Sequence, residues 1–193
     1  MKKQLSILCM LCLSLWFTAC NNAGSDKDSV EKADSANDAK ADSSTAGRPA
    51  VDEETSDFMV KTADGGMAEV ELGRAAVSKA KNKSVKDFAQ MMVDDHSKAN
   101  DELKGLAGQK NVTLPTAVSD EHKNDMDDLN KKTGADFDKA YMKMMVNDHE
   151  KTIDRFEKDS SNGKDADVSA WAAKTLPTLR KHLAHARDIN KKL

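Results

Sequence analysis

Cysteine is scarce in this chain, and every copy lies near the amino terminus. Cys9, Cys12 and Cys20 are the three cysteines among 193 residues, so the rest of the chain offers no thiol for a disulfide, a nucleophile or a zinc finger. Aromatic residues make up only 4% of the sequence, and no segment alternates between polar and apolar residues as a half-buried strand would. These absences predict a helical domain that folds without disulfides.

Signatures of several functional classes are absent as well. The net charge of −3 argues against a nucleic-acid-binding surface. No glycine-rich phosphate loop follows a strand pattern, which argues against a nucleotide enzyme. Ser84 fits a helix cap and Ser169 an exposed helix position, and neither belongs to a recognisable catalytic triad. We therefore assign no catalytic residue and expect a binding or structural protein rather than an enzyme.

Residues 1–19 have the organisation of a bacterial lipoprotein signal peptide. Two lysines precede an apolar segment, residues 5–17, that is too short to span a bilayer. The sequence Phe17-Thr18-Ala19-Cys20 then resembles a lipobox, in which Cys20 is lipidated and becomes the new amino terminus after cleavage. Cleavage would move the net charge from −3 to −5. An ordinary signal peptide with an incidental cysteine is the alternative.

A lipid on Cys20 would anchor the protein in the cell envelope of a Gram-negative bacterium. Asn21 follows the cysteine where an aspartate would favour retention in the inner membrane, so we expect the outer membrane, with the domain facing the periplasm or the cell surface. The membrane is the one partner that the sequence predicts; nucleic acid is not expected, and no protein partner is indicated.

Residues 20–52 consist mainly of alanine, serine, aspartate and lysine. Such a segment cannot bury enough apolar surface to offset the entropy lost on ordering, so we expect a disordered tether after the lipidated cysteine. Residues 53–193 remain, which is enough for one domain with a core of its own.

Apolar residues in this domain recur at intervals of three and four, which is typical of amphipathic helices. We expect four long helices and one short helix in the connection between the second and third long helices, over residues 53–81, 84–108, 119–132, 135–159 and 165–192. Ser84 is the expected cap of the second long helix, Gly65-Gly66 predicts a kink or a close helix contact, and Pro177 predicts a bend. The fold class is therefore all-α, a ferritin-like four-helix bundle.

One short phrase occurs twice, 53 residues apart. Met91-Met92-Val93-Asp94-Asp95-His96 corresponds to Met144-Met145-Val146-Asn147-Asp148-His149, and Phe88 corresponds to Tyr141. The helical phase turns both histidines toward the interior. We interpret the phrases as matching positions of two helical hairpins.

The order of these motifs resembles the family called domain of unknown function 4142. The resemblance rests on Gly-Gly-Met-Ala-Glu-Val-Glu-Leu-Gly at 65–73, the two histidine phrases, Trp171-Ala172, and Leu176-Pro177-Thr178-Leu179-Arg180-Lys181-His182-Leu183. It extends from about Ser56 to Ile189, with motifs in all four long helices. Members are often labelled outer-membrane proteins and are grouped with ferritin-like folds. The resemblance implies the bundle but no reaction, because the family itself has none assigned.

The candidate metal ligands are four polar residues expected on inward faces of different helices: Glu69, His96, His149 and His182. Met92 and Met145 stand one turn before two of the histidines and are weaker candidates, because thioether and imidazole together suit copper. Asp95 and Asp148 are candidates for outer groups that orient the imidazoles. The expected ion is a transition metal, with copper, zinc and iron all open.

A purely structural interpretation competes with the metal site. Ferritin-like di-iron proteins use Glu-x-x-His, but the residues three before the histidines are Val93, Val146 and Leu179, so a metal-dependent redox enzyme is the least supported possibility. Polar clusters can also specify packing without binding anything, and the sequence alone favours that interpretation. The protein would then be a structural or protein-interaction module of the envelope stress response. His122 and His185 are expected at the surface.

Overall fold

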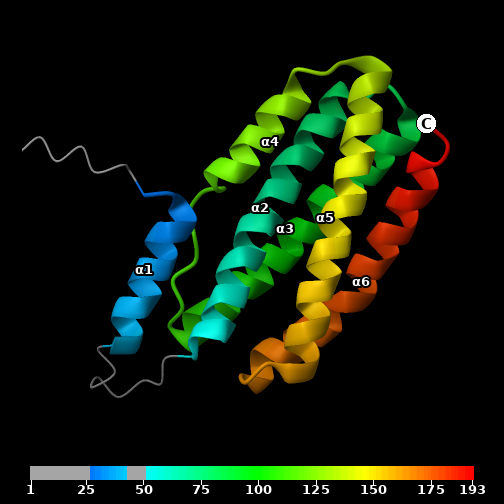
Figure 1. The fold of residues 1–193 in the computed structure, drawn as a ribbon. Coiled ribbons are helices and arrows are strands. Elements are labelled where there is room, and N and C mark those ends of the chain that lie inside the picture. The colour runs from blue at the N-terminus through cyan, green and yellow to red at the C-terminus, as the bar shows by residue number, and fades with distance from the viewer. Residues whose placement is uncertain (1–26, 43–50) are drawn as a thin grey trace, which may run out of the picture.

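The computed structural model describes residues 27–42 and 51–193, and these form six helices and no strand. The predicted signal peptide and Cys20 lie outside the described residues. The helices are α1 (Ser29–Asp42), α2 (Glu53–Lys79), α3 (Lys83–Lys110), α4 (Asp120–Asn130), α5 (Gly134–Asn162) and α6 (Ala166–Asn190) (Figure 1). The expected all-α bundle is confirmed, including the short helix, α4, between the second and third long helices. In the described ranges, no helix combines the length and apolar character needed to cross a membrane.

Short polar side chains cap three of the four long helices, and α5 begins without such a hydrogen bond. Asp52 accepts a hydrogen bond from the Thr55 amide at 3.2 Å at the start of α2, and Asp165 caps α6 in the same manner. For α3 the predicted cap, Ser84, is wrong: Asn82 accepts from the Ser84 amide at 2.8 Å, so the helix begins one residue earlier than expected. Side-chain oxygens at such positions satisfy amides that have no partner within the helix.

The four long helices form two antiparallel pairs, α2 with α3 and α5 with α6 (Figure 1). The connection through α4 runs back along the bundle, so α3 and α5 point in the same direction and occupy diagonal corners. The expectation of two corresponding hairpins is wrong, because α3 is the second helix of its pair and α5 is the first. A shift of 53 residues would also place α2 on residues 106–132, which end α3 and include α4.

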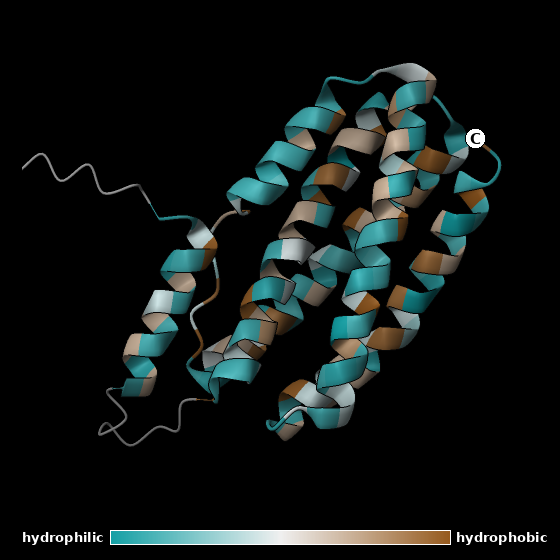
Figure 2. Cartoon of the chain, in the orientation of Figure 1, coloured by the Kyte–Doolittle hydropathy of each residue, from teal (hydrophilic) through white to brown (hydrophobic). Residues whose placement is uncertain are grey.

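The bundle core consists of two apolar clusters separated by a polar layer. Moving along α3, Met92 belongs to one cluster, His96 follows, and Leu103 belongs to the other. The order is the same on α5 and reversed on the antiparallel helices α2 and α6. The buried polar residues of these three helices at this level are Glu69, His149 and His182. Figure 2 shows the apolar residues gathered on the inner faces of these helices. The two clusters therefore fix the four helices on both sides of the polar layer.

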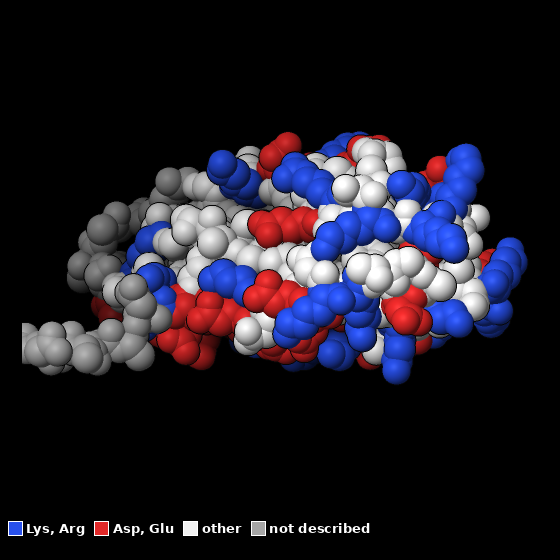
Figure 3. Space-filling view, turned by 90° about the horizontal axis from the view of Figure 1, so that it is seen from above, with Lys and Arg blue, Asp and Glu red and all other residues white. Residues whose placement is uncertain are grey.

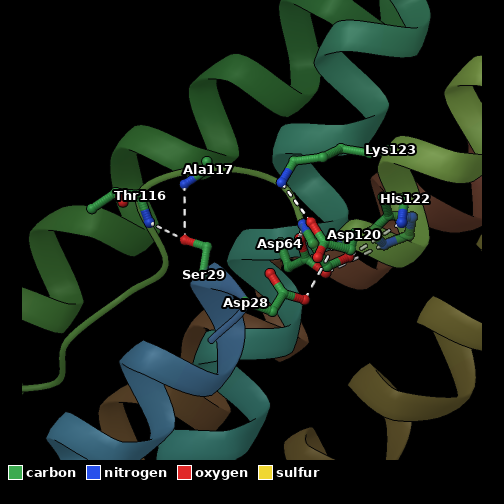
Figure 4. A network of polar contacts seen from close by, with 9 residues as sticks. Asp28, Ser29, Asp64, Thr116, Ala117, Asp120, His122 and Lys123 are labelled. Atoms are coloured by element: carbon green, nitrogen blue, oxygen red, sulfur yellow. Dashed lines mark hydrogen bonds and ion pairs between the residues drawn. The ribbon is translucent and has the colours of Figure 1, made fainter. Parts of the chain in front are cut away.

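Helix α1 lies within the segment that the composition predicts to be a disordered tether. It is mostly hydrophilic (Figure 2), yet Ala33 is buried and the Asn37 side chain exchanges two hydrogen bonds with the backbone of Thr113, at 2.7 and 3.0 Å. Ser29 accepts from the amides of Thr116 and Ala117 (Figure 4). The structure thus corrects the expectation for residues 29–42, because polar contacts with a distant connection order a segment that is too polar to form a core.

Candidate metal centre

Each long helix contributes one buried polar side chain to the layer between the apolar clusters. Glu69 comes from α2, His96 from α3, His149 from α5 and His182 from α6, and their exposed fractions are 5%, 6%, 0% and 1%. Burial of ionisable groups at this depth is costly unless each one has a partner. The stability of this layer therefore depends on the partner that each of its nitrogen and oxygen atoms has.

The three imidazoles face one another. Their ring centroids are 5.3 to 5.7 Å apart, and one ring nitrogen from each histidine lies within 4.8 Å of the other two. Imidazole nitrogens bind zinc or copper at about 2.0–2.1 Å, so three nitrogens around one ion in a plane would stand about 3.5 Å apart. Modest rotations of the rings would bring these nitrogens onto a common ion.

One nitrogen of each ring is held from outside by an oxygen. His96 Nδ1 lies 2.8 Å from Glu69 Oε2, His149 Nδ1 lies 2.8 Å from the backbone carbonyl of Met145, and His182 Nε2 lies 2.9 Å from Asp95 Oδ2. Because these oxygens accept, the three nitrogens donate, and the opposite nitrogen carries a free lone pair in each ring that is neutral. Outer acceptors of this kind orient the histidine ligands of protein metal sites.

The opposite nitrogens are buried and have no hydrogen-bond partner in the described part of the chain. They are His96 Nε2, His149 Nε2 and His182 Nδ1. Leaving a buried polar atom unsatisfied costs about 1–3 kcal/mol, so three in one place are expensive for a domain of this size. When all three rings are neutral, their three lone pairs cannot satisfy one another, and a bound cation would satisfy all of them. The donor set therefore fits a transition-metal ion.

Glu69 has a different place from the one the sequence predicts. Its carboxylate lies behind the histidines, with Oε2 on His96 and Oε1 3.4 Å from His149 Nδ1, where the contact is electrostatic rather than a hydrogen bond. It is therefore an outer partner of two rings. Asp95 has the predicted outer position, but it orients His182 from α6 rather than its own neighbour His96.

The charges of the layer depend on one another. Burial alone would raise the pKa of Glu69, but attraction to His96 and His149 and the hydrogen bond from His96 outweigh it and lower this pKa to about 2. Burial lowers the pKa of His96, and the Glu69 carboxylate more than offsets this, so the net shift is upward. Burial lowers the pKa of His182 to about 4, against the opposing bond to Asp95, and also lowers that of His149. His182 is therefore neutral at pH 7, with its lone pair available.

The remaining candidates lie outside the converging nitrogens. Met92 and Met145 are fully buried in the apolar cluster, and Met145 takes part in the site through its backbone carbonyl. Asp148 instead lines a pocket of about 240 Å³ together with Asp64 and His122. Burial raises the pKa of Asp148 to about 6, and repulsion from Glu69 adds to the shift. The second repeat therefore supplies a histidine but no aspartate to the centre.

The other two histidines do not join the centre. His122 Nε2 lies 3.5 Å from Asp64 Oδ2 near the start of α4 (Figure 4), with about a quarter of its side chain exposed. His185 is exposed and its ring contacts the edge of Phe88, with 5.6 Å between the ring centroids. Both lie near the surface, as the sequence predicts.

A cavity of about 40 Å³ adjoins the centre, and no sequence pattern predicts it. Its walls include His96 and His182 together with Thr62, Asn100, Arg155 and Thr178. These residues come from four helices, so no local pattern joins them. The one sequence signal is Gly65-Gly66, which lies one turn before Glu69 on the same helix; a Cβ at Gly66 would collide with Asn100, whereas Gly65 faces open space. The expected close helix contact at this pair is thereby confirmed for Gly66.

Comparisons with known proteins agree with the fold. No curated protein matches the chain. A crystal structure of a DUF305 fragment from Deinococcus radiodurans superposes with a TM-score of 0.67 at 11% identity, covering 75% of this chain and 100% of that one. A structure described as CopM in the Cu(II)-bound form superposes with a TM-score of 0.61 at 13% identity, covering 72% of this chain and 96% of that one. At these identities the likeness concerns the helical bundle alone.

A family model described as Domain of unknown function (DUF4142) matches residues 40–189. The match extends from the last turn of α1 through all four long helices. The chain belongs to this family.

Proposed function

We propose that this member of the DUF4142 family binds one transition-metal ion, with copper preferred, through His96, His149 and His182. The observation that carries the proposal is a cluster of three buried imidazoles, in which one ring nitrogen from each lies within 4.8 Å of the other two and each ring has one nitrogen without a hydrogen-bond partner among the described residues. A histidine cluster that only organised the core would pair its nitrogens with protein acceptors or donors. Here the outer nitrogens are paired in that way and the inner ones are not.

Copper is the preferred ion for two reasons. Imidazole suits copper, zinc, iron and nickel, and the affinity of a given nitrogen site rises along the first-row series to its maximum at copper(II). In addition, the CopM structure with a similar bundle is described as Cu(II)-bound. Zinc and iron are the competitors to compare with copper in every titration.

Binding or buffering of the ion fits the site better than redox catalysis. The carboxylate pairs that hold two metal ions in ferritin-like enzymes are missing, since Glu69 is committed to two imidazoles. The polar layer lies between two apolar clusters, which keep the histidines in place with or without an ion. The site is therefore suited to capture a metal without refolding.

The test is a metal titration of the full chain purified in detergent. After removal of metals, copper(I), copper(II), zinc and iron(II) are added while stoichiometry and thermal unfolding are followed. One equivalent of copper should raise the melting temperature, because an ion at 100 times its Kd stabilises the native state by about 2.7 kcal/mol. The shift should vanish in H96A and in H182A and persist in H185A, which removes an exposed histidine. Absence of stabilisation by any of the four ions would refute the proposal and leave the structural interpretation.

We further propose that the protein acts at the bacterial envelope, anchored by a lipid on Cys20. The support is the sequence of residues 1–20 alone. Mass spectrometry of the mature protein should find an acylated amino-terminal cysteine, and C20A should release the protein from membranes. Retention of full membrane association by C20A would refute the anchor. The face in Figure 3 bears charges of both signs, and Lys and Arg are the more numerous over the part of that face away from the grey residues.

A further inference from the structure

The cavity beside the metal centre connects buried histidines to the surface. Its walls extend from His96 and His182, which are buried, to Lys61 and Thr178, which are exposed. A volume of about 40 Å³ leaves room for about three water molecules or a ligand of similar size. The cavity is therefore both a path to the centre and a place for a small molecule next to it.

Four polar atoms of residues that line this cavity are buried and lack a hydrogen-bond partner among the described residues. They are Thr62 Oγ1, Glu69 Oε1, His96 Nε2 and His182 Nδ1. The two ring nitrogens belong to the proposed metal site, and Glu69 Oε1 lies 3.4 Å from His149 Nδ1. The Thr62 hydroxyl has no such neighbour among the described residues and can donate to a ligand inside the cavity.

The charges around the cavity favour an anion as that ligand. Arg155 on α5 lines the cavity and forms no ion pair within the described ranges, although it also lines the neighbouring pocket that contains Asp64 and Asp148. Lys61 adds a second positive charge, although Asp57 pairs with it at 2.7 Å. The two carboxylates in the walls, Glu69 and Asp95, are already engaged by histidines. Arg155 and the Thr62 hydroxyl are therefore the groups that can hold an anion beside a bound ion.

We propose that the loaded centre takes a small anion as an additional ligand, held in this cavity between Thr62, Asn100 and Arg155. The inference rests on the proposed metal binding. Three histidines leave a coordination position open on an ion that prefers four ligands, as in metal sites that admit water or substrate. The volume restricts the anion to about three heavy atoms, which suits chloride, hydroxide or azide and excludes phosphate.

The experiment uses azide with the full chain in detergent, loaded with one equivalent of copper(II). Azide bound to copper(II) gives a charge-transfer absorption band, so its affinity can be read without any activity. The band should saturate with azide, and phosphate should not compete. R155Q should weaken azide binding by about fivefold, the upper end for one partly exposed charge. The matched control is R180Q, because Arg180 pairs with Glu157 and does not line the cavity.

The outcomes separate this inference from the proposed function. If copper binds with one equivalent and azide leaves the spectrum unchanged, the inference is overturned and metal binding stands. Azide binding that is equal in R155Q and wild type would also overturn it, because the anion would then lie elsewhere. T62V is the second variant if R155Q does not fold: it removes one hydroxyl and should weaken azide, with copper stoichiometry unchanged. If no copper binds, the proposed function fails first.

Discussion

Two groups of histidines and carboxylates lie on opposite sides of Glu69, and they differ in almost every property that matters for binding. The centre has three buried imidazoles whose outer nitrogens are paired and whose inner nitrogens converge. The second group, which we call the acidic pocket, comprises His122, Asp64 and Asp148 with Glu121 and Asp125 around about 240 Å³. Its one histidine is partly exposed and paired with Asp64.

This comparison shows that residue types alone do not make a ligand set. The acidic pocket has more carboxylates than the centre, but they line a wider space, and Glu121 and Asp125 are exposed to water, which screens their charges. The centre has fewer charges, and burial makes each unpaired atom costly. Convergence and burial, rather than the number of ligand-type residues, distinguish the two.

Loss of the shared carboxylate should give the largest difference between the two groups. E69A leaves the buried His96 without its counterion and should lower the free energy of unfolding by about 3–5 kcal/mol. D64A removes an acceptor for the Ser119 amide at 2.7 Å and the contact with His122, and should cost about 1–2 kcal/mol. Urea unfolding of the metal-free protein measures both. Equal losses of stability in E69A and D64A would contradict the greater dependence of the buried centre on its carboxylate.

Loss of a histidine should separate the groups by metal affinity. H182A should weaken copper binding by more than about 100-fold, because even loss of an outer partner of a ligand costs about 10–100-fold. H122A, in the acidic pocket, should leave the affinity unchanged. Competition with a chromophoric chelator measures both values. A weaker copper affinity in H122A would mean that the ion binds in the acidic pocket rather than at the three buried histidines.

In the acidic pocket, substitution of Asp148 should change the pH dependence of stability. Burial and repulsion from Glu69 raise the pKa of Asp148 to about 6 in the folded state, above its unfolded value, so ionisation of Asp148 costs stability above pH 6 and the cost fades as pH falls toward 4. Lys151 and His122 oppose the shift and Asp125 adds to it. D148N should therefore stabilise the metal-free protein by about 1 kcal/mol at pH 7.5, after allowance for solvent screening, and by less at pH 5. A constant difference across this range would contradict the assignment.

The smallest effect is expected at the glycine that borders both groups. Gly65 lines the cavity and the acidic pocket, and a Cβ there meets no atom within 4 Å. G65A should stabilise the protein by about 0.5–1 kcal/mol through helix propensity and leave copper affinity unchanged. The control is G73A, whose Cβ would meet a Val93 methyl at 2.8 Å and the Ala89 carbonyl at 3.1 Å, and which should destabilise. Thermal unfolding distinguishes the signs.

Periodicity predicted which side chains of the centre face inward, but not how they meet. His96, His149 and His182 could be found because each lies on an apolar stripe, and a stripe fixes a direction. The role of Glu69 could not be found in this way, because a shift of one helix by part of a turn exchanges an inner position for an outer one. Which ring nitrogen faces inward depends on acceptors from other helices, such as Asp95 on α3 for His182 on α6.

The features that the sequence did not predict depend on contacts between distant segments. Helix α1 is ordered by bonds between Asn37 and Thr113, which composition cannot show. The cavity joins Thr62 on α2 to Arg155 on α5, and neither residue belongs to a motif. The cap at Asn82 rather than Ser84 is a smaller miss, within the two residues by which helix ends are commonly uncertain.

The three histidines differ in how easily a mutation removes the group that orients the ring, because His149 is held by a backbone carbonyl. His96 and His182 depend on carboxylates that a single nucleotide change can remove, whereas any residue at position 145 supplies the same oxygen as long as α5 remains helical. Without selection, mutations would therefore remove the acceptors of His96 and His182 independently, whereas the acceptor of His149 would remain. After such losses the Met145 carbonyl would still orient the His149 ring, so His149 is the position from which the three-histidine cluster could evolve again.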